Sequence, residues 1–335
     1  MKSSEDFDAF YQREVKGTIE KLDVKRQQLV EKYSFKKYWR NLKWLLLFTV
    51  LGGVARAAVP DIVPEQVGLI AAAMIAYGVI GGIYLLIKRT LTFKPVIAEY
   101  KQQVIPKIIR FVNPEMNYDS SLGIRAEEFT AGEIFRPPTY FKSEDLVHGN
   151  IDGVEVRMSD VTATRRERSG SKGDNDEITL FKGFYGIAKF GEPFSAQVIL
   201  KPSNQALEAL EKLGGMAKKL FGGLVASIME RMELTEIQIG HEEFDKAYLI
   251  RSSDRDQALT VLTPTLMQLI LTFNKELELP VTLSFKGDQL HFGFSQMDMF
   301  ELHLNQSLVE KDISKEYFRH LNLALGLVEG VKTLR

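Results

Sequence analysis

The stretch LVHGNIDGVEVRM, residues 146–158, contains the dipeptide Asp152-Gly153, which suits the two-residue type I′ turn of a β-hairpin. A turn at these two residues aligns three pairs across the hairpin: Ile151 with Val154, Gly149 with Val156, and Val147 with Met158. One face of the hairpin is then consistently apolar, as a strand pair packed on a core requires. The stretch therefore predicts an antiparallel sheet with a buried face.

Strand patterns continue after this hairpin. The polar segment RRERSGSKGDNDE, residues 165–177, is predicted to be a flexible insertion, and LFKGFYGIAKF (180–190) and PFSAQVIL (193–200) resume the strands. Two further strands are expected near residues 237–239 and 247–251. Together with helical segments, these patterns predict an α+β fold, with a cytosolic, mixed and mainly antiparallel sheet domain and covering helices.

Residues 205–232 are predicted to form a long amphipathic helix with a basic border. One interpretation is that this helix covers the sheet of its own domain, and the other is that it lies in a membrane interface. The breadth of its apolar face favours the first. The apolar side chains are Leu207, Leu210, Met216, Ala217, Leu220, Leu224, Val225 and Ile228, and the basic ones are Lys212, Lys218, Lys219 and Arg231.

The segment FDKAYLIRSSDRDQALTVLTPTLMQLI, residues 244–270, places Asp254, Arg255 and Asp256 between a strand and a helix. These residues form either a catalytic cluster or the polar joint between the two elements. Ser253 can cap the helix, with Asp256 in a position like that of a capping box. A second helix start is predicted at Thr263-Pro264, followed by a buried face of Leu266, Leu269, Ile270 and Phe273. Since each polar residue has a local structural role, the interpretation as a polar joint is favoured over a catalytic cluster.

Two apolar runs predict a transmembrane helical hairpin at residues 41–90. WLLLFTVLGGVARAAVP, residues 44–60, is interrupted only by Arg56, and VGLIAAAMIAYGVIGGIYLLI, residues 67–87, has no charged residue. Each run has about the length that crosses a hydrocarbon core of roughly 30 Å. The alternative is a pair of buried helices in a soluble core, although such helices seldom lack a polar face.

Basic residues flank both ends of the predicted hairpin: Lys36, Lys37, Arg40 and Lys43 before it, and Lys88, Arg89 and Lys94 after it. The two ends of a hairpin lie on the same side of the membrane, and the only basic residue near the connecting loop is Arg56. The positive-inside rule then predicts a cell (inner) membrane protein with two spans and both termini in the cytoplasm. Small residues four apart, such as Gly68, Ala72 and Ala76, let helices pack closely within the hairpin or between two copies. The expected partners are the lipid bilayer and a protein in the same membrane, with self-association as an alternative.

The remaining parts of the chain are predicted to be a cytosolic amphipathic helix at residues 1–40 and the cytosolic α+β domain at residues 91–335. The apolar stripe of the first helix is Phe7, Tyr11, Val15, Ile19, Leu22, Leu29 and Tyr33. A further helix is expected at residues 92–112, where Pro106 should introduce a kink.

The composition is that of a folded protein. The chain has 335 residues, 45% of them hydrophobic, a formal net charge of −1 and no cysteine. The charge gives no bias towards nucleic acid, so no nucleic-acid partner is expected. The absence of cysteine excludes disulfides, thiolate metal sites and a cysteine nucleophile.

No catalytic, cofactor-binding or metal-binding set is predicted. The five histidines are His148, His241, His291, His303 and His320, and none forms a close metal-ligand pair along the chain. His241 is expected on a strand, His148 is expected opposite Arg157 on the hairpin, and His291 and His303 could converge from neighbouring strands. Phosphate loops, calcium loops and nucleophile elbows do not occur in the sequence.

Several stretches resemble the bacterial domain-of-unknown-function family labelled 3137. They are EEFDKAYLIRSSDRDQALTVLTPTLMQLIL (242–271), LSFKGDQLHFGF (283–294), MFELHLNQSL (299–308) and the earlier LFKGFYG. The most specific positions are Phe244, Tyr248, Ile250, Ser252 and Asp254, followed by Leu262-Thr263-Pro264. The segment DRDQALTVL departs from the Glu-Ala-Arg-Tyr that the family often has. The resemblance covers roughly residues 140–330 and implies a bacterial membrane protein of unassigned activity, with no catalytic residues to carry over.

The sequence as a whole favours a membrane-anchored, cytosolic-facing binding or scaffold module over an enzyme, with envelope maintenance as a candidate role. The alternative is a membrane-bound enzyme whose site converges only in three dimensions. Perturbed pKa values clustered in a deep pocket would favour that alternative.

Overall fold

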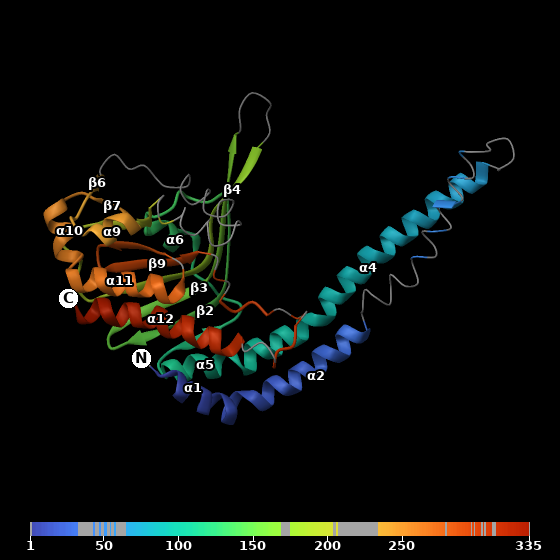
Figure 1. Cartoon of the computed structure of the whole chain (residues 1–335), viewed down its shortest axis with the longest axis horizontal. Helices are drawn as coiled ribbons and strands as arrows, with labels where there is room; N and C mark the ends of the chain where they lie inside the picture. The colour runs from blue at the N-terminus through green and yellow to red at the C-terminus, as the bar shows by residue number, and fades with distance from the viewer. Residues whose placement is uncertain are drawn as a thin grey trace. The chain divides into compact units, whose positions relative to one another are not determined.

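The structure of the protein is a computed structural model that describes residues 2–32, 43, 47, 50, 51, 54, 57, 65–168, 175–203, 206, 234–278, 280–295, 297, 299–302, 304, 306–309 and 313–334 (Figure 1). The chain divides into two compact units. The sheet unit consists of Met1–Glu14, Ile105–Glu301 and Ile313–Arg335, and the helical unit consists of Val15–Val104 and Leu302–Asp312. The helix predicted at residues 205–232 lies outside the described residues, apart from Ala206.

The sheet unit is built on a nine-stranded sheet with the order β1-β2-β3-β4-β9-β8-β5-β7-β6. The strands are β1 (Asn117–Asp119), β2 (Tyr140–Ile151), β3 (Val154–Arg168), β4 (Asn175–Lys189), β5 (Val198–Pro202), β6 (Thr235–Ile237), β7 (Tyr248–Ser252), β8 (Val281–Lys286) and β9 (Gln289–Ser295). All of these neighbours pair in the antiparallel sense, so the predicted α+β class is confirmed, but the described sheet is antiparallel where a mixed sheet was predicted.

The predicted hairpin is formed by β2 and β3. Asp152 and Gly153 both have positive φ angles, 48° and 90°, as the central residues of a type I′ turn require. The predicted register is confirmed, with Ile151 opposite Val154, Gly149 opposite Val156, and Val147 opposite Met158. The dipeptide with its alternating flanks was therefore sufficient to define this part of the sheet.

Three local predictions require correction. The polar segment 165–177 is not a loop throughout, because β3 and β4 continue into it and pair as far as Arg168 with Asn175. In PFSAQVIL only the last three residues belong to a strand, β5. The residues between β6 and β7 form a short helix, α9 (Glu242–Ala247), where a strand was predicted for His241.

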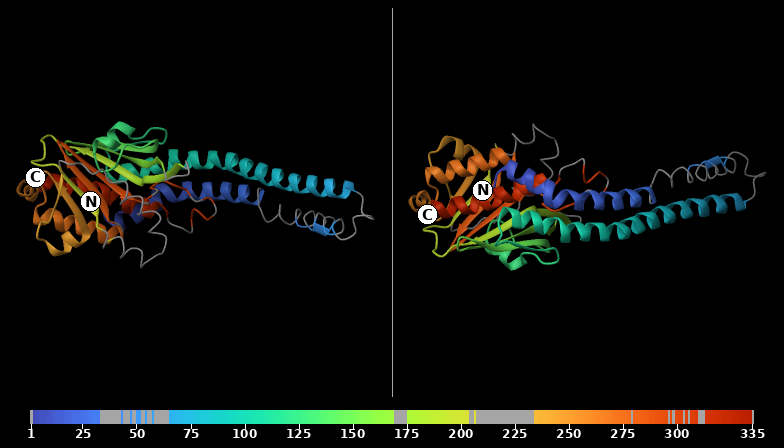
Figure 2. Two further views of the ribbon diagram at one scale, coloured as in Figure 1. Left: turned by 90° about the horizontal axis from the view of Figure 1, so that it is seen from above. Right: turned by 90° about the horizontal axis from the view of Figure 1, so that it is seen from below.

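The two faces of the sheet have different covers. On one face Phe184 contacts Phe300, which in turn contacts Tyr317 of helix α12 (Ile313–Thr333). On the other face Phe181 and Tyr185 pack with α6 (Ala126–Ala131) and its flanking residues. Figure 2 shows α6 on the opposite side of the sheet from α12 and from α11 (Pro264–Leu277). The sheet is thus the middle layer of its unit.

The N-terminal segment forms α1 (Ser4–Phe10), a π-helical turn (Tyr11–Val15) and α2 (Lys16–Lys32). Ser3 caps α1, because its hydroxyl accepts a hydrogen bond from the backbone N–H of Asp6. Within the sheet unit, the ring of Phe7 stacks on Phe318 at 4.4 Å between centroids. Residues 33–40 of the predicted helix lie outside the described residues.

In the helical unit, α2 packs on α4 (Glu65–Gln103), and Lys25 and Glu99 form an ion pair at 2.7 Å between them. The buried carboxylate of Asp23 accepts hydrogen bonds from Arg26 and from the backbone N–H of Leu308. Burial would raise the pKa of Asp23, but these hydrogen bonds outweigh it and hold the pKa below its usual range. The hydrogen bond from Leu308 therefore ties residues 302–312 to α2.

The predicted transmembrane helical hairpin is corrected by the structure. Within the described parts of the chain, no helix combines the length and the apolar character that a bilayer-spanning segment needs. The run 67–87 is not a separate element, because α4 is a single helix of 39 residues that continues into a charged, ion-paired portion. The run 44–60 lies outside the described residues, apart from Leu47, Val50, Leu51, Val54 and Ala57. The helix predicted at residues 92–112 with a kink at Pro106 is divided between α4, which ends at Gln103, and α5 (Ile105–Val112).

Candidate functional site

The strand–helix joint at Asp254–Asp256 consists of local structural contacts. Asp254 is the N-cap of α10 (Arg255–Val261), and its Oδ1 accepts a hydrogen bond from the N–H of Gln257 at 2.9 Å. The cap is one residue later than the predicted Ser253. The carboxylate of Asp256 is 94% exposed, and Arg255 donates to the carbonyl oxygen of Gln238. Thr263 and Pro264 begin α11 as predicted.

The histidines do not converge in the described part of the chain. His148 lies opposite Arg157 on the hairpin as predicted, and His241 caps α9 through its Nδ1. His320 lies on α12, and His303 is outside the described residues. Among the residues that were described, no group of three histidine, aspartate or glutamate side chains is arranged to hold a metal ion.

His291 belongs to a set of mostly polar side chains on the α6 side of the sheet, which we call the polar face. Strand alternation and register place its members on three neighbouring strands. The set comprises Gln197, which directly precedes β5, Ile199 and Lys201 of β5, Thr282, Ser284 and Lys286 of β8, and Gln289, His291 and Gly293 of β9. The opposite face of the same strands carries Val198, Leu200, Val281, Leu283, Phe285, Leu290, Phe292 and Phe294, all buried.

One end of the polar face is held by Glu133. Its carboxylate accepts hydrogen bonds from Lys286 and, at 2.8 Å, from the side-chain amide of Gln197. Lys286 also donates to the carbonyl oxygen of Ala131 at 3.2 Å. Glu133 has a positive φ of 56°, a conformation that places its carboxylate over the sheet at some conformational cost. The positive charge of Lys286 and the negative charge of Glu133 are therefore paired at this end.

The middle of the polar face is a buried tyrosine–histidine couple. The hydroxyl of Tyr185 lies 3.1 Å from Nδ1 of His291, and Oε1 of Gln289 lies 3.1 Å from Nε2. These partners match a neutral imidazole protonated on Nε2, which accepts a hydrogen bond from the tyrosine. Burial lowers the pKa of His291 to about 4, so the ring stays neutral near neutral pH. Gly132 passes so close that an added Cβ would lie 2.6 Å from the Tyr185 hydroxyl.

The other end of the polar face is different. Thr282 and Ser284 are buried, and in the described structure neither hydroxyl has a hydrogen-bond partner. Lys201 is only 4% exposed. Burial, reinforced by the nearby charge of Arg251, lowers the pKa of Lys201 from 10.5 to about 7. Buried polar groups without partners are exceptions in folded proteins, and each calls for an explanation.

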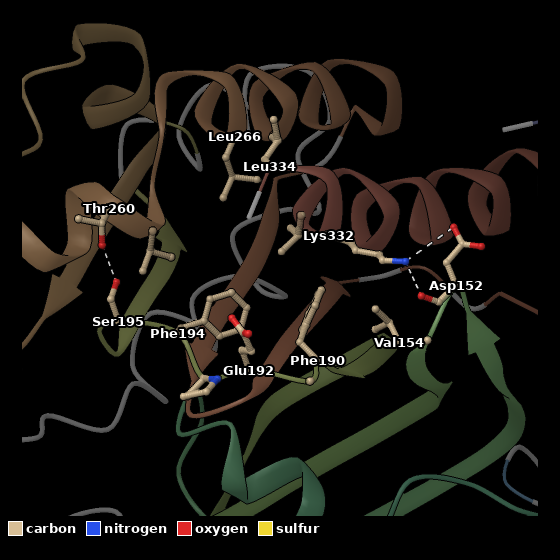
Figure 3. Close-up of a pocket in the computed structure, with 15 residues that line it drawn as sticks. Asp152, Val154, Phe190, Glu192, Phe194, Ser195, Thr260, Leu266, Lys332 and Leu334 are labelled. Carbon is tan, nitrogen blue, oxygen red and sulfur yellow. Dashed lines mark hydrogen bonds and ion pairs between the residues drawn. The ribbon is translucent and has the colours of Figure 1, made fainter.

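A cavity of about 530 Å³ lies elsewhere in the sheet unit, where the β2–β3 turn, the β4–β5 connection, the α10–α11 joint and the end of α12 meet (Figure 3). Most of its lining side chains are apolar: Val154, Phe190, Pro193, Phe194, Val261, Leu266, Val331 and Leu334. Its size and lining are typical of a small-molecule or side-chain binding site.

The polar groups of this cavity are paired with one another. Lys332 donates to the carbonyl oxygen of Asp152 and lies 4.0 Å from its carboxylate. The hydroxyl groups of Ser195 and Thr260 share a hydrogen bond (Figure 3). Ser195 also donates to the carbonyl oxygen of Gln257. A nucleophilic hydroxyl needs an adjacent base, and within the described residues neither of these two hydroxyls bonds to a histidine or a carboxylate. The arrangement suits binding better than bond making.

No sequence motif could have indicated either site. The cavity is assembled from four segments that are far apart in the chain, and the polar face depends on the register of β5, β8 and β9. The only available sequence signals were the aromatic residues around Gly191 and the alternation of polar and apolar residues in LSFKGDQLHFGF. Alternation of this kind predicts one buried and one solvated face, whereas here both faces are buried.

Comparisons with known proteins bear on the sheet unit. No curated protein sequence matches the chain. A crystal structure of the mycobacterial trehalose monomycolate transport factor A, TtfA, has 10% sequence identity and a TM-score of 0.32, over 67% of this chain and 95% of that one. That similarity is below the level that indicates a shared fold.

The family comparison agrees with the resemblance seen in the sequence. Residues 179–333 match the model of the family described as Protein of unknown function (DUF3137). This range contains β5 to β9, the whole polar face, and helices α9 to α12. The segment of residues 179–333 is therefore similar to the DUF3137 family.

Proposed function

We propose that this protein is a non-catalytic binding module that takes an apolar anchor of a protein partner into the cavity. The observation that carries the proposal is the cavity of about 530 Å³, with apolar walls and polar groups that are already paired. Large apolar side chains that fill such a pocket dominate the free energy of many protein interfaces. Because Asp152 and Lys332 pair with each other, a charged group on the partner is not required.

The enzyme alternative receives less support. Lys201 and His291 do have lowered pKa values, as a catalytic site often shows. Neither residue lines the cavity, however.

The proposal includes a role for this binding module in an envelope-related assembly.

The proposed place of action is a lipid bilayer, with the termini in the cytoplasm. Support comes from large apolar side chains that are exposed in the helical unit, between 46% and 65% in each case. They are Leu47, Val50, Leu51, Val54, Ile80, Ile83, Tyr84, Leu86, Ile87 and Leu91. Exposed apolar surface of this kind is typical of contact with lipid or protein. Self-association through the small residues near Ala76 stays a prediction.

A photo-crosslinking experiment tests the binding proposal. A photoreactive amino acid in place of Thr260, which is exposed at the cavity, should crosslink the full-length protein in intact cells to one defined partner. Leu334→Glu places a charge in the cavity and should remove that crosslink. The control variant Leu122→Glu changes a leucine that is 54% exposed outside the cavity and should retain the crosslink. Equal crosslinking in both variants would exclude the cavity as the binding site.

A further inference from the structure

The inference concerns the unpartnered end of the polar face and is independent of the cavity. The register of β5 and β8 pairs Leu200 with Leu283 and Ile199 with Ser284, so the next pair along the same ladder is Lys201 with Thr282. Directly opposed residues of an antiparallel pair project from the same face with their Cβ atoms about 5 Å apart. Ser284 lies two residues from Thr282 and therefore projects from that face as well.

These three side chains offer hydrogen-bond donors and positive charge. A lysine ammonium has three donors and no acceptor, and each hydroxyl can donate once. In the described structure, Thr282 Oγ1 and Ser284 Oγ have no partner, and the charge that acts on Lys201 is the positive charge of Arg251. All three residues are more than nine-tenths buried. A buried ammonium group without a counter-charge is costly, so this combination calls for an acceptor.

The surrounding charges favour an anion over a cation. Arg251 projects from the same face as Ile199, its register partner, and donates to the carbonyl oxygen of Leu234 at 2.7 Å. The carboxylate of Glu133, which holds the other end of the polar face, is already bound to Lys286. His291, opposite Ser284, stays neutral near neutral pH because burial lowers its pKa to about 4. The described environment of Lys201 is therefore electropositive.

We propose that Lys201, Thr282 and Ser284 bind the oxyanion of a phosphate group, either free phosphate or a phosphomonoester such as a lipid headgroup. The ammonium group of Lys201 supplies the counter-charge, and the two hydroxyls donate to the phosphate oxygens. A phosphate has enough oxygen acceptors to satisfy all three side chains at once, and charge-assisted hydrogen bonds of this type are the strong ones. The site satisfies the groups that the protein itself leaves unpaired.

Isothermal titration calorimetry of the full-length protein tests this site with two probes, inorganic phosphate and glycerol 3-phosphate. Lys201→Met should weaken the binding of whichever probe binds by at least about tenfold, the effect of losing one charge-assisted hydrogen bond. Thr282→Val keeps the shape of the side chain and should weaken binding by roughly threefold to tenfold. Lys142→Met removes an exposed lysine that pairs with Glu144 and serves as the matched control, with unchanged affinity.

The two probes distinguish the sources of the phosphate group. Tighter binding of glycerol 3-phosphate would assign the site to a phosphomonoester headgroup, and equal or tighter binding of inorganic phosphate would assign it to the free ion. The proposal is overturned if neither probe binds, or if Lys201→Met and Lys142→Met bind with the affinity of the wild type. Thr282→Val keeps the test decisive if Lys201→Met does not fold, because a folded Thr282→Val protein with wild-type affinity also contradicts the site.

Discussion

The clearest stability prediction is that Lys201 makes the folded protein more stable as the pH rises above neutrality. The side chain is 4% exposed, and burial lowers its pKa from 10.5 to about 7. Between these two values the unfolded chain holds the proton and the folded chain does not. Folding then releases a proton, so the free energy of unfolding increases with pH in this window. Below the folded pKa both states hold the proton, and the cost of burying the charge is constant.

The magnitude follows from the width of the window. Each pKa unit corresponds to about 1.4 kcal/mol. From about pH 7, where the folded lysine is half protonated, to about pH 9, where it is neutral, the wild type should gain about 2 kcal/mol that Lys201→Met does not gain. His291 does not contribute in this range, because its pKa of about 4 lies below it.

The assay is urea unfolding followed by far-ultraviolet circular dichroism at both pH values, for the wild type, Lys201→Met and Lys142→Met. Urea is uncharged, so the electrostatic terms are not screened. The difference between the two pH values should be smaller in Lys201→Met by the predicted amount and unchanged in Lys142→Met, whose lysine is exposed. The same pH dependence in all three proteins would show that Lys201 is not a buried, proton-releasing group, and the reasoning would fail.

Three further predictions concern local structure, and urea unfolding measures each. Asp254→Ala should cost about 0.5–2 kcal/mol because the cap of α10 is lost, whereas Asp256→Ala should stay within about 0.5 kcal/mol; equal effects would contradict the assignment of the cap. Gly132→Val should cost about 1–3 kcal/mol, because its Cβ would meet the Tyr185 hydroxyl at 2.6 Å, and a neutral effect would argue against this close approach. Phe7→Ala should cost about 3–5 kcal/mol, since the ring is fully buried against α12, and a loss below about 1 kcal/mol would show that α1 is not docked.

Local chemistry explains the predictions that were confirmed. Asp152-Gly153 adopts the positive φ angles of its turn, and the turn then sets the register as far as Val147 with Met158, beyond which the register shifts. Thr263-Pro264 begins a helix because the threonine caps it and proline needs no N–H at that position. Both signals act within a few residues, so the sequence contains all that they need.

Predictions that depended on more distant context were less accurate. The polar segment after β3 was interpreted as a loop, but cross-strand pairing extends the strands into it. The run 67–87 was interpreted as a separate membrane span, whereas it continues into the charged part of α4. In each case the prediction was based on the composition of a short stretch, but the strand or helix in the structure extends beyond that stretch.

The sequence by itself determined the α+β sheet domain, the hairpin register, the helix start at Thr263 and the resemblance to the DUF3137 family. Only the tertiary structure decided which polar residues are buried and which of them meet. Lys201 and Thr282 are 81 positions apart in the chain, and they become neighbours because β5 pairs with β8. Sequence periodicity shows which side of a strand a residue faces, but the cover over that side comes from other segments. The sites of this protein therefore depend on strand pairing over long sequence separations, which no local pattern specifies.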